Sequence, residues 1–82
     1  MKNKNIDPIH FIHEVFGFLN DSKLNFSDNF KKLTTWNSLN AVIIHHKIVQ
    51  AYGVELNYEI FNTLETVEDL YQAVINKLNN AS

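Results

Sequence analysis

The sequence predicts an all-α domain: a four-helix bundle with a long loop between the first two helices and a short third helix. Apolar residues recur at helical spacing in several segments, signals for helix starts and stops bound these segments, and no segment alternates as a strand would. The chain has 82 residues, of which 45% are hydrophobic and 20% are charged. That length is enough for one hydrophobic core but not for two, so we expect a single domain over residues 1–82.

The first helix is expected over residues 7–20. Asp7 is a typical N-cap residue, and Pro8 fits the first helical position, where a missing N–H group costs nothing. Apolar side chains then recur at helical spacing at Ile9, Ile12, Phe16 and Leu19. Gly17 should weaken this helix by about 1 kcal/mol relative to alanine.

Residues 21–36 are predicted to form the long loop. Its apolar side chains are too many for a free loop, and we expect them to hold it against the core: Phe26, Phe30, Leu33 and Trp36. Lys31 and Lys32 form only a local basic doublet, which most simply belongs to a solvated stretch of this loop.

The second helix is expected over residues 38–52, with Gly53 as its C-cap. At 100° per residue, one arc collects Ala41, Ile44, Ile48, Ala51 and Tyr52, with Val42 and Val49 at its flank, and we assign this arc to the core. The opposite side collects Asn40, His46, Lys47 and Gln50, and also the aliphatic residues Leu39 and Ile43. Isolated apolar residues are common on protein surfaces, so this pair can be without function; its adjacency to Ser38 equally fits a patch on which a partner protein docks.

The last two helices are expected over residues 59–63 and 66–79. A brief extended piece, "VELN", precedes them. Thr66 can cap the final helix, and Asp69 three residues later completes a capping box. The buried stripe of this helix is predicted to comprise Val67, Leu70, Val74 and Leu78.

Composition excludes several classes of function. There is no cysteine, which excludes disulfides, thiolate metal sites and cysteine nucleophiles. All seven basic residues are lysines and the net charge is −2, so we expect no nucleic-acid partner. The longest aliphatic run is "AVII" and the first residues lack the apolar segment of a signal peptide. We therefore expect no membrane insertion, a cytoplasmic location and a monomer.

The histidines do not indicate catalysis or metal binding. His45 follows Ser38 by seven residues, about 10 Å along a helix axis, which is too far to activate the serine as a nucleophile. His10 and His13 are spaced i, i+3 and precede Glu14, but a catalytic zinc site needs a third ligand and a supporting shell. His45 is expected in the core with its ring nitrogen satisfied, and His46 on the surface. We expect neither an enzyme nor a metal site.

Ser38 stands at the start of the second helix, directly after Asn37, a natural N-cap. It can simply be a good first-turn residue. The N-terminus of a helix also carries unpaired N–H groups and a partial positive charge, which favour a phosphate by about 0.3–1 kcal/mol. A serine at this position is therefore well placed to carry a phosphodiester.

Two stretches, "WNSLNAVIIHHKIVQAYGVEL" and "LETVEDLYQAVINKL", make the chain resemble the acyl carrier protein family. That family has Asp-Ser-Leu at the start of its second helix, often preceded by tryptophan in free-standing carriers. It also has an aromatic-Gly-Val/Ile ending to that helix and a Thr-Val-x-Asp-Leu start to the fourth. The corresponding residues here are Trp36, Ser38, Leu39, Tyr52, Gly53, Val54, Thr66, Val67, Asp69 and Leu70. The resemblance is close over about residues 30–78. The order and spacing of these motifs, taken together, are fairly specific to the family.

The resemblance implies a free-standing carrier whose Ser38 is esterified with 4′-phosphopantetheine, taken from coenzyme A by a phosphopantetheinyl transferase. The thiol of that arm would hold an acyl group as a thioester for acyl-loading and acyl-transferring enzymes. It further implies that partners dock on Leu39, Ile43, His46 and Lys47, and that the acyl group lies beside Ile48, Leu56 and Ile60.

Two departures from the family pattern bear on this expectation. Asn37 replaces the aspartate before the serine; it caps the helix equally well but lacks the charge that helps the transferase and its magnesium engage. The second helix also carries no carboxylate, so partners with basic patches should bind it poorly. The sequence thus predicts a carrier for a specialised lipid, polyketide or related pathway, and leaves open an unmodified carrier-like domain that only binds proteins.

Overall fold

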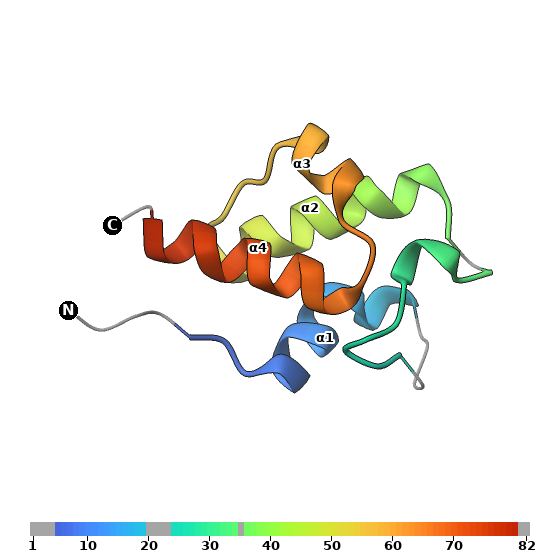
Figure 1. The fold of residues 1–82 in the computed structure, drawn as a ribbon, viewed down its shortest axis with the longest axis horizontal. Coiled ribbons are helices and arrows are strands. Elements are labelled where there is room, and N and C mark those ends of the chain that lie inside the picture. The colour runs from blue at the N-terminus through green and yellow to red at the C-terminus, as the bar shows by residue number, and fades with distance from the viewer. Residues whose placement is uncertain (1–4, 20–23, 35, 81–82) are drawn as a thin grey trace.

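Four α-helices make up most of the computed structural model, which describes residues 5–19, 24–34 and 36–80 (Figure 1). They are α1 (Pro8–Phe16), α2 (Ser38–Tyr52), α3 (Tyr58–Thr63) and α4 (Val67–Asn80). Two 3₁₀ helices, η1 (Gly17–Leu19) and η2 (Phe30–Lys32), lie between α1 and α2. The described residues form no strand, only an isolated β-bridge between Asn29 and Thr66. The predicted all-α class and short third helix are confirmed, while predictions for positions 20–23 and 35 lie outside the described residues.

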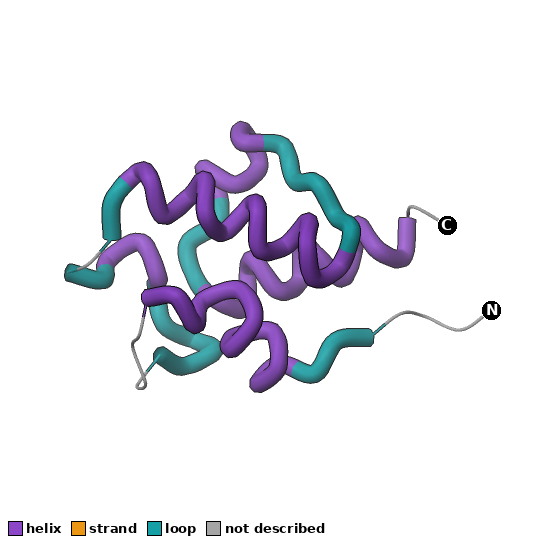
Figure 2. The backbone as a smooth tube through the Cα atoms, turned by 180° about the vertical axis from the view of Figure 1, so that it is seen from behind, coloured by secondary structure: helices purple, strands orange, loops and turns teal. Residues whose placement is uncertain are grey.

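The two long helices, α2 and α4, lie in two layers, and α1 packs beneath them in the view of Figure 1. In Figure 1, α4 lies in front of α2, and Figure 2 shows α2 in front of α4 from the opposite side. Helix α1 contacts both of them. Helix α3 lies across the upper edge (Figure 1), where Phe61 is buried in the common core. None of the helices in the described part of the chain is both long and apolar enough to cross a membrane.

Helix α1 is shorter than predicted. Asp7 caps it as expected, because its side chain accepts a hydrogen bond of 3.0 Å from the His10 N–H. The α-helix ends at Phe16, and the chain continues as η1 from Gly17, a residue with a weak helical preference. The apolar pattern holds for Phe16, which is buried, and for Ile12 and Leu19, which pack against the core. It fails for Ile9, which is 67% exposed, and it missed the buried residues Phe11 and Val15.

The long loop is held by aromatic contacts, as predicted. Phe30 is fully buried, and its ring lies 5.3 Å from that of Trp36 and 5.9 Å from that of Phe61. Phe26 packs its ring 5.0 Å from Tyr71 of α4. The prediction that the lysine doublet is simply solvated is wrong for Lys31, which is half-buried and hydrogen-bonds to α3.

The start of α4 is capped twice. Thr66 Oγ1 accepts from the Asp69 N–H, and the Asp69 carboxylate accepts from the Thr66 N–H, so the predicted capping box is confirmed. The next two N–H groups donate to carbonyls of the long loop: Val67 to Asp28 at 3.0 Å and Glu68 to Phe26 at 2.8 Å. Backbone of the loop therefore satisfies amides that a helix start otherwise leaves unpaired.

Helix α2 has the predicted bounds, and its predicted core arc is confirmed at Ile44 and Ile48 but not throughout. It ends at Gly53 in the left-handed conformation, with φ of 68°. Its buried residues are Asn40, Ile44 and Ile48, so the assignment of Asn40 to the surface is wrong. Three residues assigned to the core arc or its flank are exposed: Val42, Val49 and Ala51. The neighbouring helices cover the side of α2 that carries Ile44 and Ile48. The observed buried arc therefore lies further from Val42 around the helix than the predicted arc.

Candidate functional site

Ser38 is exposed and is the first residue of α2, where the sequence predicts it. Asn37 caps the helix: its side-chain oxygen accepts a hydrogen bond of 3.2 Å from the Asn40 N–H. The first turn contains no acidic residue. The positive end of the helix dipole at Ser38 is therefore not neutralised by a carboxylate in that turn.

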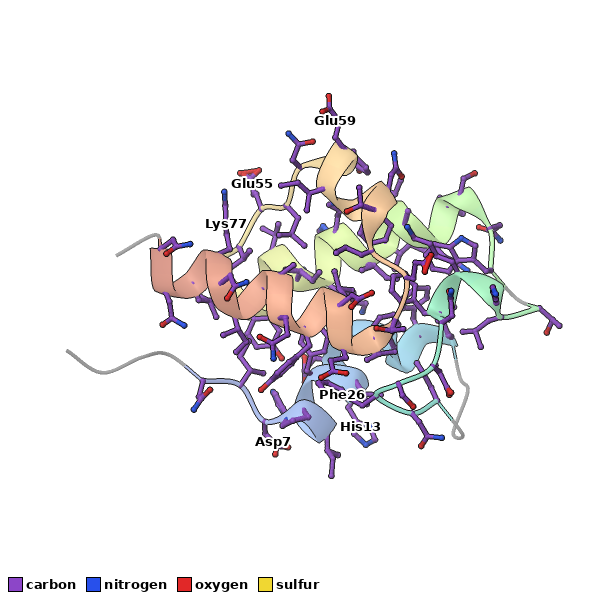
Figure 3. All side chains as sticks on the ribbon, in the orientation of Figure 1. Asp7, His13, Phe26, Glu55, Glu59 and Lys77 are labelled. Atoms are coloured by element: carbon purple, nitrogen blue, oxygen red, sulfur yellow. The ribbon has the colours of Figure 1, made fainter. Side chains whose placement is uncertain are left out.

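A groove of about 320 Å³ lies between α2, the segment that follows it and the start of α3. It is lined by Val42, His45, His46, Val49, Glu55, Leu56 and Tyr58. The wall is mostly apolar, and the carboxylate among these residues, Glu55, is exposed. Figure 3 shows Glu55 and Glu59 pointing away from the bundle.

The groove lies on the same side of α2 as Ser38. At 100° per residue, Val42, His45 and Val49 fall within about 40° of Ser38 around the helix axis. At 1.5 Å per residue they extend from about 6 Å to about 16 Å beyond Ser38 along that axis. A group attached to Ser38 and lying back along α2 would therefore enter this groove.

His45 is the polar side chain set deepest in the α2 wall. Its ring stacks against Tyr58 at 4.1 Å and lies 4.8 Å from the ring of Phe61. Nδ1 is 2.8 Å from the carbonyl oxygen of Ala41. Since that oxygen can only accept, Nδ1 carries the proton, and Nε2 of the neutral ring is a bare acceptor.

Nε2 of His45 is buried and has no hydrogen-bond partner among the described residues. The predicted satisfied ring nitrogen of His45 is confirmed at Nδ1, while the side chain is half-buried and not fully in the core. Buried polar atoms without partners are few in folded proteins, and each calls for an explanation.

Two of the predicted acyl-pocket residues, Ile48 and Leu56, belong to the same buried core cluster, and the third, Ile60, is exposed. Leu56 lines the groove, whereas Ile48 is 1% exposed within the core and Ile60 is 49% exposed on α3. Val42, Val49, His45 and Tyr58 line the groove without having been predicted from the sequence. Their angular position relative to Ser38 was available for the three on α2, but the two valines had been assigned to the core flank.

The predicted docking residues divide into two pairs. Leu39 and His46 are exposed, and with Val42 and Val49 they follow the spacing i, i+3, i+7, i+10 along one face. Ile43 and Lys47 are half-buried at the edge of that face. The exposed stripe of α2 is therefore Leu39, Val42, His46 and Val49, closer to the groove than predicted.

The histidines of α1 form no metal centre. Nε2 of His10 lies 3.9 Å from a carboxylate oxygen of Glu14, and both side chains are exposed. His13 also lies on the surface of α1 (Figure 3). Within the described residues, no three side chains of the types that bind metals are grouped closely enough to hold an ion.

Comparison with known proteins adds nothing to this site. No family model, no curated protein and no solved structure matches the chain. The function has to be argued from the exposed serine, the stripe beside it and the groove.

Proposed function

We propose that this chain is a carrier protein of the acyl-carrier type, with 4′-phosphopantetheine attached through a phosphodiester to Oγ of Ser38. The bound arm would supply a terminal thiol that holds an acyl group as a thioester. The observation that carries this proposal is the exposed Ser38 hydroxyl at the N-terminus of a fifteen-residue helix, with an apolar groove on the same side.

Each of these features suits the attached group. A phosphate on Ser38 would lie at the positive end of α2, where helix amides and the dipole favour negative charge. The exposed side chain leaves room for a transferase to reach Oγ. The chain itself would carry out no reaction; it would present the loaded group and exclude water from it in the groove.

The stripe on α2 favours apolar contacts with partner proteins. Leu39, Val42 and Val49 are 63%, 50% and 42% exposed, which is unusual for aliphatic residues of one helix face. The partners would be the phosphopantetheinyl transferase and the enzymes that load and remove the acyl group. Because α2 has no carboxylate, enzymes that recognise an acidic helix should bind poorly, which supports a role in a specialised pathway.

Intact mass spectrometry tests the attachment. The protein is incubated with coenzyme A, magnesium and a broad-specificity transferase, and we expect a gain of one phosphopantetheinyl group. Ser38→Ala should abolish the gain, whereas Ser27→Ala, which removes another exposed serine, should leave it unchanged. No gain with several transferases would contradict the proposal.

A second candidate is an unmodified domain with the carrier fold that binds proteins through the same stripe. Asn37 favours it, because the aspartate that assists the transferase in the family is missing. Under this alternative, partner binding would survive Ser38→Ala but be lost in Leu39→Ser. If the chain is instead a carrier, both variants should fail to form complexes between the acyl-loaded protein and its partner enzymes.

A further inference from the structure

Tyr58 brings an open aromatic ring to the groove. It is the first residue of α3, it lines the groove, and it is 53% exposed. Its ring stacks against that of His45, with the ring centres 4.1 Å apart and an angle of 30° between the planes. Within the described part of the chain no other ring contacts it. Part of the Tyr58 ring is therefore free to contact a group that lies in the groove.

Tyr58 is the outer member of a series of rings that reaches into the core. The His45 ring lies 4.8 Å from that of Phe61, which is 1% exposed. The Phe61 ring in turn stacks with Trp36, with the ring centres 6.5 Å apart and 24° between the planes. The series thus has a buried inner end and an exposed outer end, and a further planar ring could extend it at Tyr58.

The aliphatic residues of the groove do not distinguish a flat ring from a saturated group. Val42 and Val49 are 50% and 42% exposed, and any apolar group that covers them is stabilised in proportion to the area removed from water. The ring of Tyr58 does distinguish them. Aromatic pairs in offset-stacked or edge-to-face arrangements are more stable than their buried area alone accounts for.

The ring of Tyr58 lies within reach of a group tethered at Ser38. His45, on which Tyr58 stacks, follows Ser38 by about two turns of α2, or about 10 Å along the helix axis. A phosphopantetheine arm is longer than this, so a group at its end can lie against Tyr58 without stretching the arm.

We propose that the groove selects a carried acyl group with a planar aromatic ring, which packs against Tyr58, over a saturated acyl group of the same size. The cargo would then be an aryl acyl thioester rather than a fatty acyl chain. This inference rests on the proposed function, because it assumes that the carried group is tethered at Ser38.

The test uses a tether that needs no transferase. The chain has no cysteine, so Ser38→Cys can be alkylated at a single site. Two haloacetamide probes with identical pantetheine-like arms are compared. One ends in a benzoyl group and the other in a cyclohexanecarbonyl group, which has as many carbon atoms but no planar ring. The readouts are nuclear Overhauser contacts between the probe and the Tyr58 ring, and the ratio of groove-bound to free probe, obtained from the methyl resonances of Val42 and Val49.

We expect the benzoyl probe to contact the Tyr58 ring, and its ratio of bound to free probe to exceed that of the cyclohexyl probe by roughly two- to tenfold, the effect of one aromatic pair. Tyr58→Leu keeps an apolar side chain but removes the ring, and should make the two ratios equal. Tyr58→Phe keeps the ring and should retain the preference. Ile60→Ala, which changes an exposed residue of α3 that does not line the groove, should also retain it.

Three outcomes would overturn the inference. Equal ratios for the two probes would mean that the groove does not distinguish a flat ring. A preference without contact to Tyr58, or one that survives Tyr58→Leu, would mean that another feature selects the group. The first two are measured with Tyr58 in place, so they decide the question even if Tyr58→Leu does not fold.

The result is separable from the test of the proposed function, because alkylation bypasses the transferase. Equal ratios together with enzymatic modification of Ser38 would contradict this inference alone. A clear preference for the benzoyl probe without enzymatic modification would contradict only the proposed attachment.

Discussion

The ammonium group of Lys31 donates a hydrogen bond of 2.8 Å to the carbonyl oxygen of Phe61, thirty residues further along the chain. The same nitrogen lies 4.9 Å from the centre of the Phe61 ring. One side chain of η2 thus fixes the last turn of α3, and α3 in turn supplies Tyr58 and Phe61 to the ring of His45. The loop between α1 and α2 therefore helps to hold one wall of the groove.

Replacing Lys31 with methionine tests this connection. Methionine keeps the apolar stem but removes the donor and the cation, so the free energy of unfolding should fall by about 1–2 kcal/mol. Urea denaturation measures the change. Lys32→Met, at the exposed neighbouring position, should stay within about 0.5 kcal/mol of the parent protein. Equal effects from the two changes would contradict a specific role for Lys31.

The two glycines should respond to alanine with opposite signs. Gly53 has φ of 68°, so a side chain there adds backbone strain and should cost about 1–2 kcal/mol. Gly17 has right-handed helical angles and open space around a Cβ, so alanine there should stabilise by about 0.4–1 kcal/mol. Thermal unfolding of both variants checks the pair, and a stabilised Gly53→Ala would refute the left-handed cap.

Two tyrosines, the half-buried Tyr52 and the buried Tyr71, form another matched pair. The Tyr52 hydroxyl is buried without a hydrogen-bond partner among the described residues, and burial raises the pKa of this phenol. Tyr52→Phe should therefore be neutral or stabilising by up to about 1 kcal/mol. The Tyr71 hydroxyl donates to the Ile6 carbonyl, so Tyr71→Phe should cost about 1 kcal/mol. Chemical denaturation that ranked the two variants in the reverse order would exclude this arrangement.

Asp69 should make the start of α4 sensitive to acid. Hydrogen bonds from the backbone N–H groups of Thr66 and Glu65 lower the pKa of its carboxyl below the ordinary value of 3.8. A lowered pKa contributes stability that is present above that ordinary value and is lost as the pH falls through the lower, folded-state pKa.

The corresponding variant is Asp69→Asn. It should be less stable than the parent protein by about 0.5–1 kcal/mol at pH 7, and the difference should shrink below about pH 4. Urea titrations at several pH values measure this. Glu68→Gln, which alters the other carboxylate in the first turn, should show a smaller difference. A difference that persisted unchanged at pH 2 would mean that charge is not its source.

Capping signals predicted the helix ends well, because each capping interaction joins residues only a few positions apart. Asp7, Asn37, Thr66 and Gly53 all cap the helices that they were expected to cap. The buried faces were predicted less well, because they depend on which neighbour covers which side. Periodicity placed Ile9 with the apolar residues of α1, but the covered side of that helix is the one with Phe11 and Val15.

For the site, sequence reasoning located the serine and the cap but not the groove. Ser38 and Asn37 are neighbours in the chain, so their relationship follows from the start of one helix. The groove is lined by residues of α2 together with Leu56 and Tyr58. The local sequence pattern of either segment does not indicate that the two lie side by side. The unpartnered nitrogen of His45 was missed for the same reason, since its neighbours Tyr58 and Phe61 come from another helix.

The pairing of Val67 and Glu68 with Asp28 and Phe26 has a consequence for how the chain folds. These acceptors lie about forty residues before their donors, so the loop must close before the first turn of α4 is complete. A peptide spanning only the last helix would fray at its start. In the intact protein, hydrogen exchange at those two amides should follow global unfolding rather than local opening.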